Sequence, residues 1–157
     1  MQKVALAVMR LQPLHRGHEL VIETMLARAD RVIVAIGSIQ AQDGRNPYSF
    51  AKRKEMVRAL YGDRVEVVGL SDIGAPTPRI WAEYVLSQIA QEGLPAPTAY
   101  YCGAEDAFWF EGVLPVYSID RQAAGEGISA TQIRADLQAG RSVADRLSAA
   151  VLALIKE

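Results

Sequence analysis

One stretch near the start of the chain limits the possible folds most strongly. Residues 3–10 read KVALAVMR, a nearly continuous apolar run. Such a run is typical of a strand that is buried on both faces of a parallel sheet, because a strand covered on one face alternates between apolar and polar residues. Apolar residues then recur at helical spacing from Leu20 to Leu26. The order of strand, loop and helix predicts an α/β protein.

The rest of the chain repeats this alternation. We expect strands near residues 3–10, 31–38, 64–70, 98–103 and 113–118, and helices near 17–29, 49–60, 78–92, 105–111, 130–139 and 143–155. This pattern predicts a doubly wound, Rossmann-like parallel sheet of about five strands with helices on both faces. A chain of 157 residues fits one domain, 1–157. Ligands bind such sheets beyond the carboxyl ends of the strands.

Composition restricts the kind of partner. The formal net charge is -1 and the pI is near 6.1, so no overall basic field favours nucleic acid or an anionic membrane. The apolar stretches are shorter than the roughly 20 residues of a membrane-spanning helix, and the first residues lack a signal-peptide pattern. The only cysteine, Cys102, excludes an intrachain disulfide and is expected to be a buried small side chain. We therefore expect a cytoplasmic protein that binds small molecules.

His15-Arg16-Gly17-His18 lies where the first strand ends and the first helix begins. A helix N-terminus presents unpaired N–H groups and the positive end of the helix dipole, which stabilise an anion. Gly17 lets backbone approach closely, and two histidines three residues apart can donate hydrogen bonds to one polyphosphate. The simpler alternative is a capping or packed histidine. A metal site is not expected, since the chain has only these histidines and no spaced acidic partner.

A second motif, Ile128 to Arg134, reads ISATQIR. Ser129 resembles the N-cap of another helix, which would gather Ser129, Thr131 and Arg134 at one helix start. Hydroxyls and backbone N–H groups there can bind phosphate oxygens, and the guanidinium can hold a phosphate with two hydrogen bonds. An ordinary capped amphipathic helix with an exposed arginine is the alternative. The presence of both motifs in one short α/β chain favours a phosphate-binding site.

These motifs carry a resemblance to a known family. The segment RLQPLHRGH (residues 10–18), with the motif of residues 128–134, resembles the nucleotidyltransferase superfamily, and more narrowly the archaeal type of nicotinamide-nucleotide adenylyltransferase. Further matching positions are Ile36-Gly37-Ser38-Ile39-Gln40, Arg45-Asn46-Pro47-Tyr48, and Lys52, Arg53 and Met56. The resemblance covers most of the chain and is weakest between residues 92 and 122.

The resemblance implies adenylyl transfer from ATP to nicotinamide or nicotinate mononucleotide, with release of pyrophosphate. A phosphate monoester is already a nucleophile, so positioning and charge stabilisation suffice for catalysis. The implied catalytic residues are His15, His18 and Arg134, with His18 nearest the transferred phosphate. The implied substrate-binding residues are Arg10, Gln12, Gly17, Arg45, Ser129, Thr131 and Trp81. A Mg²⁺ ion is expected on the ATP phosphates, held mainly by substrate and water.

Several positions depart from the family pattern or are ambiguous. The family's glycine before the first arginine is Met9, and its aromatic residue or methionine two positions later is Leu11. Met9 raises the question of how adenosine is seated, or of a changed substrate. Trp81 matches a family tryptophan that stacks on nicotinamide, but it also fits the apolar anchor of a helix. Phe108-Trp109-Phe110 fits only a core or subunit contact.

Other interpretations remain open at this point. Pantetheine-phosphate adenylyltransferase has the same length, fold and chemistry, but its first motif usually has TxxH-type spacing. A class I aminoacyl-tRNA synthetase shares a HIGH-like signature but needs room for tRNA-binding domains. A nucleotide sensor without activity is a third possibility, for which Met9 is the only hint. The sequence does not choose between nicotinamide and nicotinate forms, and we expect a homo-oligomer of unspecified size.

Overall fold

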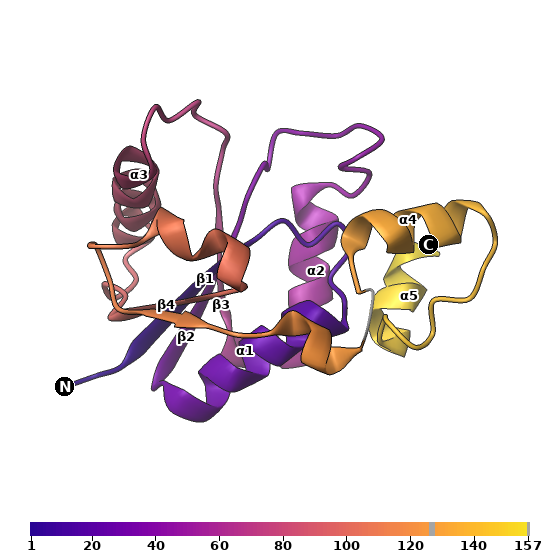
Figure 1. The fold of residues 1–157 in the computed structure, drawn as a ribbon, viewed down its shortest axis with the longest axis horizontal. Coiled ribbons are helices and arrows are strands. Elements are labelled where there is room, and N and C mark those ends of the chain that lie inside the picture. The colour runs from indigo at the N-terminus through magenta and orange to yellow at the C-terminus, as the bar shows by residue number, and fades with distance from the viewer. Residues whose placement is uncertain (126–127, 157) are drawn as a thin grey trace.

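The computed structural model describes residues 1–125 and 128–156. Its centre is one five-stranded parallel sheet with the strand order β3-β2-β1-β4-β5 (Figure 1). The strands are β1 (Val4–Met9), β2 (Arg31–Ile36), β3 (Glu66–Gly69), β4 (Ala99–Cys102) and β5 (Val116–Ser118). Every strand lies inside the range predicted for it, so the predicted sheet is confirmed.

Strand β1 occupies the middle of the sheet, between β2 and β4. Ala5 and Ala7 face one hydrophobic core, while Val4 and Leu6 face the other. Burial on both faces explains why the first strand is apolar without alternation.

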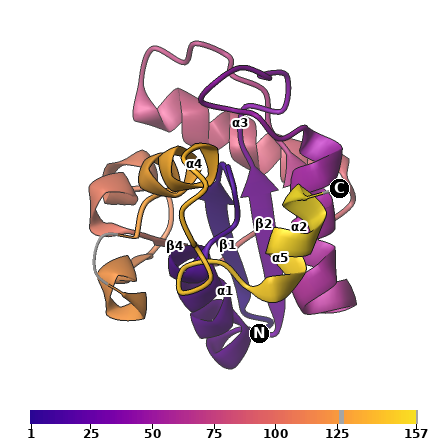
Figure 2. The same cartoon turned by 90° about the vertical axis from the view of Figure 1, so that its right-hand side faces the viewer.

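Helices cover both faces of this sheet (Figures 1 and 2). One core is shared by α1 (Arg16–Arg28), α2 (Phe50–Tyr61) and α5 (Ala149–Ile155). The opposite core is closed by α3 (Pro78–Gln91) and the 3₁₀ turn η2 (Ala104–Trp109). The remaining helix, α4 (Ala130–Gln138), packs through Ile133 and Leu137 against the segment before α5 and against α5 itself. Two further 3₁₀ turns are η1 (Gly62–Arg64) and η3 (Arg121–Ala124).

Hydroxyl side chains define where four helices begin. Ser49, Thr77, Ser129 and Ser148 precede α2, α3, α4 and α5, and each side chain accepts a hydrogen bond from a backbone N–H in the first turn. Such N-caps satisfy donors that a helix leaves unpaired. The predicted cap at Ser129 is therefore confirmed.

Two predicted helices were wrong in extent or type. The helix expected over 143–155 begins only at Ala149. Val143 and Leu147 have helical spacing and are buried, but they lie in a turn and pack against Ile133 of α4. The helix expected over 105–111 is the 3₁₀ turn η2. Apolar spacing cannot distinguish a helix from turns that bury the same residues.

The connections of the sheet define a switch point. From β1 the chain moves outward through β2 and β3, and β4 then lies on the other side of β1. In an open α/β sheet this arrangement leaves a crevice beyond the carboxyl ends of β1 and β4. Across the described residues, no helix has both the length and the apolar character needed to cross a membrane.

Candidate active site

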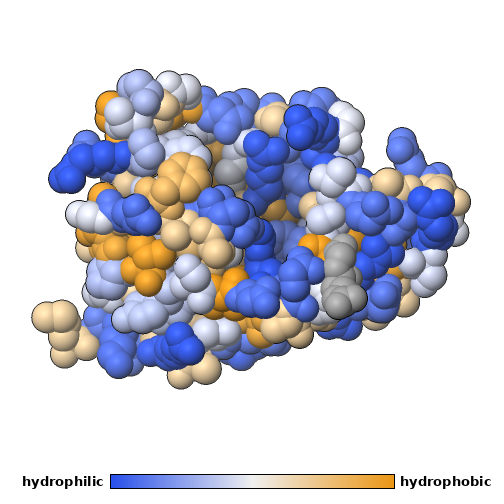
Figure 3. Space-filling view, in the orientation of Figure 1, coloured by the Kyte–Doolittle hydropathy of each residue, from blue (hydrophilic) through white to orange (hydrophobic). Residues whose placement is uncertain are grey.

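A pocket of about 550 Å³ lies at this crevice. Figure 3 shows the hollow in the middle of the molecular face, bordered by hydrophilic side chains. Its walls come from the ends of β1 and β2, the loop after β3, and residues of α1, α3, η2 and η3. The site predicted from the sheet topology therefore coincides with a pocket of the structure.

His15 and His18 form a reciprocal cap at the start of α1. The Nδ1 atom of His15 accepts a hydrogen bond from the Gly17 N–H at 3.0 Å, and Nδ1 of His18 accepts from the His15 N–H at 3.1 Å. The two rings stack with their centroids 3.8 Å apart. Since each Nδ1 is an acceptor, the proton of each neutral ring is on Nε2. His18 lines the pocket and can donate from Nε2 there.

Both histidines are neutral at pH 7. Burial, and secondarily the charge of Arg121, lower the pKa of His15 to about 4. Burial, His15 and Arg121 lower the pKa of His18 well below its ordinary value. The two imidazoles therefore act as uncharged hydrogen-bond donors with a fixed orientation.

The missing side chain of Gly17 makes room for the His15 ring of this cap. A Cβ at residue 17 would lie 2.9 Å from Cε1 of His15 and 3.4 Å from Cβ of Arg121. Any side chain would therefore displace the His15 ring. The prediction that Gly17 permits close approach holds, but what approaches is the protein's own histidine.

The predicted binding residue Gln12 makes its contacts with protein backbone. Its Nε2 donates to the carbonyl of Tyr48 at 2.9 Å, and its Oε1 accepts from the Tyr48 N–H at 3.0 Å. The side chain is almost fully buried. Gln12 thus ties the loop after β1 to the loop before α2, which makes it a positioning residue in this structure.

Arg53 of α2 has a similar role that the sequence did not reveal. Its side chain is fully buried. Nη1 donates to the carbonyls of Arg10 at 2.9 Å and Gly37 at 2.7 Å, and Nη2 donates to the carbonyl of Ser38 at 3.1 Å. One guanidinium thereby holds together the loops that leave β1 and β2.

Arg134 joins the two sequence motifs. Its Nη1 donates to the carbonyl of Gln12 at 2.7 Å, across 122 positions of sequence, and Nη2 lies 3.5 Å from Oγ1 of Thr131. Ser129 uses Oγ to cap α4, accepting from the Gln132 N–H at 3.1 Å, and Thr131 is exposed. The distal motif therefore lies beside the loop that leads from β1 to His15 and the start of α1.

Positive charge gathers between these motifs. Burial, then the charges of Arg45 and Arg10, lower the pKa of Arg134. Arg10 lines the pocket, and Arg45 is exposed in the loop before α2. Three arginines within range of one another's charge repel in the absence of an anion, so the arrangement suits phosphate groups.

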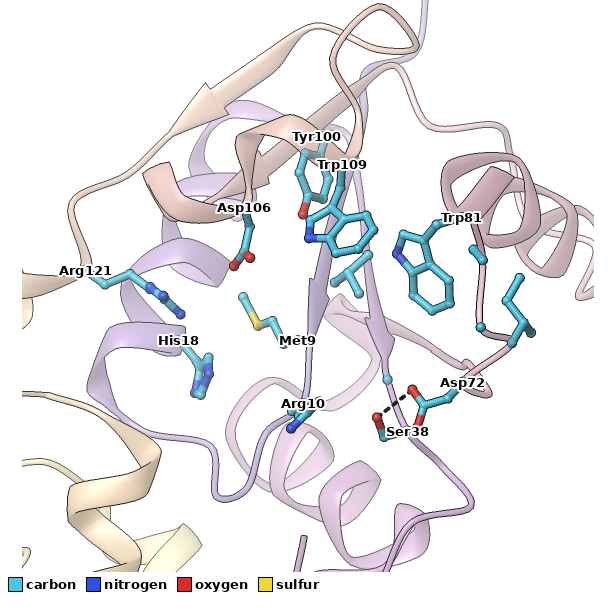
Figure 4. Close-up of a pocket in the computed structure, with 15 residues that line it drawn as sticks. Met9, Arg10, His18, Ser38, Asp72, Trp81, Tyr100, Asp106, Trp109 and Arg121 are labelled. Atoms are coloured by element: carbon cyan, nitrogen blue, oxygen red, sulfur yellow. Dashed lines mark hydrogen bonds between the residues drawn. The ribbon is translucent and has the colours of Figure 1, made fainter. Parts of the chain in front are cut away.

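Two tryptophans form the opposite end of the pocket, as Figure 4 shows. Trp81 comes from α3 and Trp109 from η2, with ring centroids 6.2 Å apart at an interplanar angle of 61°. Trp81 also packs against the core, so the anchoring and pocket-lining interpretations both hold for it. In the expected cluster of Phe108, Trp109 and Phe110, Phe110 is buried in the core and Trp109 faces the pocket. Phe108 is exposed and packs on Trp109 with ring centroids 4.5 Å apart.

Hydrogen bonds hold the loop after β3 in place beside the tryptophans. Asp72 accepts a hydrogen bond from Oγ of Ser38 at 2.8 Å (Figure 4), and its backbone exchanges two longer contacts with the Gln40 amide. Ser38 and Gln40 belong to the IGSIQ segment at the end of β2. This segment therefore supports the pocket through the neighbouring loop.

Sequence reasoning missed two charged residues of the pocket, Asp106 and Arg121. Burial raises the pKa of Asp106, and a hydrogen bond with the Trp109 side chain opposes that shift. Arg121 forms an ion pair with Glu105. Both lie in or next to 3₁₀ turns where the resemblance was weakest. The available signal was their position just after predicted strands, at the ligand-binding edge of the sheet.

Comparisons with known proteins agree with this geometry. Residues 10–136 match the model of the cytidylyltransferase-like family. The nicotinamide-nucleotide adenylyltransferase of Pyrococcus horikoshii is 32% identical over 165 residues, covering 97% of this chain and 82% of its own length. The chain belongs to the nicotinamide-nucleotide adenylyltransferase family.

Other relatives match over part of their length. The nicotinamide-nucleotide adenylyltransferase of Thermococcus kodakarensis is 38% identical over 96 residues, which cover 57% of this chain and 50% of that protein. A bifunctional NMN adenylyltransferase/ADP ribose pyrophosphatase from Francisella tularensis has a TM-score of 0.81 at 19% identity, covering 99% of this chain and 49% of its own. The chain thus spans about half the length of these two proteins. A second structure of the Francisella protein, complexed with AMP and a manganese ion, has a TM-score of 0.76.

Met9 is where this adenylyltransferase-family site departs most from the resemblance. Its side chain lines the pocket near Arg10 and His18 (Figure 4), and it is nearly buried against the core that α1 covers. A glycine there would leave that volume open. The methionine narrows the middle of the pocket without displacing either histidine.

Proposed function

We propose that this chain transfers AMP from ATP to nicotinamide mononucleotide or its nicotinate analogue, forming the dinucleotide and pyrophosphate. The observation that carries the proposal is one pocket lined by Arg10, His18 and Arg121 at one end and by two tryptophans at the other. A mononucleotide is complementary to these two ends, because it carries a phosphate at one end and a flat ring at the other. Family membership supports the reaction class.

In the proposed reaction, an oxygen of the acceptor phosphate attacks the α-phosphorus of ATP. The new P–O bond forms as the bond from the α-phosphorus to the bridging oxygen breaks, and that electron pair leaves on pyrophosphate. No side chain has to remove a proton from the acceptor phosphate, because a phosphate monoester is largely ionised at neutral pH. Catalysis then depends on alignment and on stabilising charge on the phosphoryl oxygens.

Different side chains of the site can align the substrates and stabilise the charge on the phosphoryl oxygens. The Nε2–H of His18 is oriented by its cap and can donate to an oxygen of the transferred phosphoryl group. His15 holds the start of α1 and stacks on His18. Arg134, with Ser129 and Thr131, lies beside the same loop and can bind the leaving pyrophosphate. Arg10 and Arg45 complete the cationic side and can hold the acceptor phosphate.

The aromatic end favours a pyridine ring. One face of the ring can stack on Trp81 while Trp109 contacts it from the side, an arrangement that matches aromatic packing preferences. The pyridinium of nicotinamide mononucleotide is a cation and gains further from the tryptophan faces.

Magnesium enters this proposal as part of the substrate. Among residues 1–125 and 128–156, no group of three or more His, Cys, Asp or Glu side chains is arranged to hold a metal ion. A Mg²⁺ ion carried by the ATP phosphates keeps most of its water and needs few protein ligands. It would neutralise charge on the polyphosphate while His18 and the arginines orient it.

The decisive experiment is pyrophosphate release from ATP and Mg²⁺ with four acceptors: nicotinamide mononucleotide, nicotinate mononucleotide, phosphopantetheine and flavin mononucleotide. We expect release only with the two pyridine nucleotides, and the ratio of their kcat/KM values ranks them. Release only with another acceptor would contradict the proposal. Calorimetric ATP binding without any release would favour a nucleotide sensor instead.

Three further properties remain predictions of this proposal. We expect a single domain over residues 1–157, a cytoplasmic location and a homo-oligomer. Sedimentation of the purified chain measures the last of these, and a monomer at micromolar concentration would contradict it.

A further inference from the structure

Arg121 extends into the pocket from the first residue of η3 (Figure 4). The turn packs against α1, and Cβ of Arg121 lies 3.4 Å from where a Cβ on Gly17 would be. Its charge contributes to the low pKa of both His15 and His18. The arginine is therefore next to the histidine cap.

The Arg121 guanidinium also lies at the end of β4. A Cβ on Gly103, the residue after that strand, would be 2.9 Å from Nε of Arg121 and 2.7 Å from Oε1 of Glu105. The ion pair of Arg121 and Glu105 thus packs closely against Gly103, which lies at the switch point of the sheet. This is the crevice in which an α/β sheet places its ligand.

The ion pair is exposed enough to be exchanged. The side chain of Glu105 is 58% exposed and that of Arg121 is 30% exposed. Ion pairs between such groups contribute little net stability, because water already solvates both charges. A phosphate carries more charge than a carboxylate and matches the planar guanidinium with two parallel hydrogen bonds.

We infer that Arg121 is an additional phosphate-binding side chain of this site, and that Glu105 holds its guanidinium until an anionic substrate replaces the carboxylate. Arg121 contacts the substrate phosphate from the β4 side of the pocket, which His18 and Arg10 also line. The inference rests on the proposed function for the identity of the substrate. Its test uses inorganic pyrophosphate, so the two can fail separately.

The test is calorimetric titration of the full chain with pyrophosphate at pH 7.5, for the wild type and the variants Arg121→Ala and Glu105→Gln. Losing a charge-assisted bidentate contact should weaken pyrophosphate binding by about tenfold to a hundredfold in Arg121→Ala. Removing the competing carboxylate in Glu105→Gln should leave binding unchanged or tighten it by up to about fivefold. The two variants therefore move affinity in different ways.

A purely structural ion pair makes the opposite prediction. If Arg121 and Glu105 only connect η3 to η2, both variants should weaken binding to the same degree, and that result would overturn the inference. Unchanged binding in Arg121→Ala, or no measurable binding of millimolar pyrophosphate to the wild type, would also overturn it.

Two further variants keep the test interpretable. Arg58 lies on α2, away from the pocket, and forms an exposed ion pair with Asp63 of η1. Arg58→Ala should therefore bind pyrophosphate like the wild type. Should Arg121→Ala fail to fold by circular dichroism, Arg121→Lys keeps the charge and the aliphatic stem but loses the bidentate geometry. It should bind severalfold more weakly, and equal binding would contradict the inference.

Discussion

The two sides of the pocket are built in different ways. At the start of α1, His15 and His18 are buried and each is bound to backbone of the same four-residue motif. On the β4 side, Asp106 and Arg121 come from separate 3₁₀ turns, and Arg121 is held by an exposed carboxylate. The first side is complete without a substrate, whereas the second has a partner that a substrate can replace.

This difference separates two ways of binding charge. Buried donors such as the His18 ring lose no orientational freedom when a phosphate arrives, which is how preorganised groups stabilise developing charge. Exposed ion pairs are weak and exchangeable, so they adapt to what is bound. We expect substitutions on the α1 side to affect stability and turnover, and those on the β4 side to affect affinity.

The largest expected effect tests the support beneath the α1 side. Arg53→Met should lower the free energy of unfolding by about 3–5 kcal/mol, because it leaves the buried carbonyls of Gly37 and Ser38, and the partly buried carbonyl of Arg10, without their donor. Urea denaturation measures this. Arg58→Met on the exposed face of the same helix should change stability by no more than about 0.5 kcal/mol. Equal losses in both variants would show that the buried guanidinium is dispensable.

The next effect is a dependence of stability on pH. The pKa of His15 is about 4 in the folded protein and 6.5 for an ordinary exposed histidine, so unfolding takes up a proton in this range. Its contribution is fully present above pH 6.5 and is lost as the pH falls toward 4, by about 3 kcal/mol. Denaturation between pH 7 and pH 4 measures the slope. A flat profile would mean that the histidines are not buried as neutral groups.

Of the acidic groups, Asp106 opposes this slope because burial raises its pKa, whereas Asp136 titrates below this range. The pKa of Asp136 is lowered to about 2, first by its hydrogen bonds with Arg141 and Arg146. Its contribution is present above the ordinary carboxyl pKa and disappears only at lower pH. His15→Gln, which keeps an acceptor for the Gly17 N–H, should reduce this slope, and the slope that remains belongs mainly to His18.

Removing His18 should act on turnover. By analogy with the loss of one preorganised oxyanion donor, His18→Ala should lower kcat by about a hundredfold. Steady-state pyrophosphate release with saturating ATP and nicotinamide mononucleotide measures it, with circular dichroism to confirm the fold. A decrease of less than about threefold would remove His18 from the phosphoryl group.

The smallest effect concerns the aromatic end. Trp109→Leu should raise KM for the mononucleotide by about twofold to tenfold with little change in kcat, since an aromatic contact contributes about 0.5–1.5 kcal/mol. Phe108→Leu is the matched control: the ring is exposed and lies outside the pocket lining, but it packs on Trp109 with centroids 4.5 Å apart, so KM should change by less than about twofold. Loss of stability in Trp109→Leu at an unchanged KM would assign Trp109 to the core alone.

The same contrast explains what the sequence could predict. The strands, the start of α1 and the cap at Ser129 follow from local patterns, namely buried apolar runs and N-cap chemistry. The predicted proximity of the two motifs follows from the sheet topology. These features depend on residues close in sequence or on rules common to all parallel sheets.

Residues positioned by tertiary contacts escaped prediction. Arg53 reaches carbonyls 15 to 43 residues away, and nothing in its own helix distinguishes it from a surface arginine. Arg121 and Trp109 lie in 3₁₀ turns, which have no hydrophobic period to reveal which side faces a pocket. Val143 and Leu147 caused the opposite error. Their helical spacing predicted a helix, but both are buried from a turn that precedes α5.

The central claim is that the α1 side is built in advance from two neutral histidines that donate from Nε2. The most direct test is ¹⁵N NMR of the imidazole rings from pH 8 to pH 5, and the spectrum is simple because the chain has two histidines. We predict that both rings keep the proton on Nε2, with Nδ1 as acceptor, and that neither becomes charged across this range. Ionisation of either ring near pH 6.5, or a proton on Nδ1 of His18, would contradict the account.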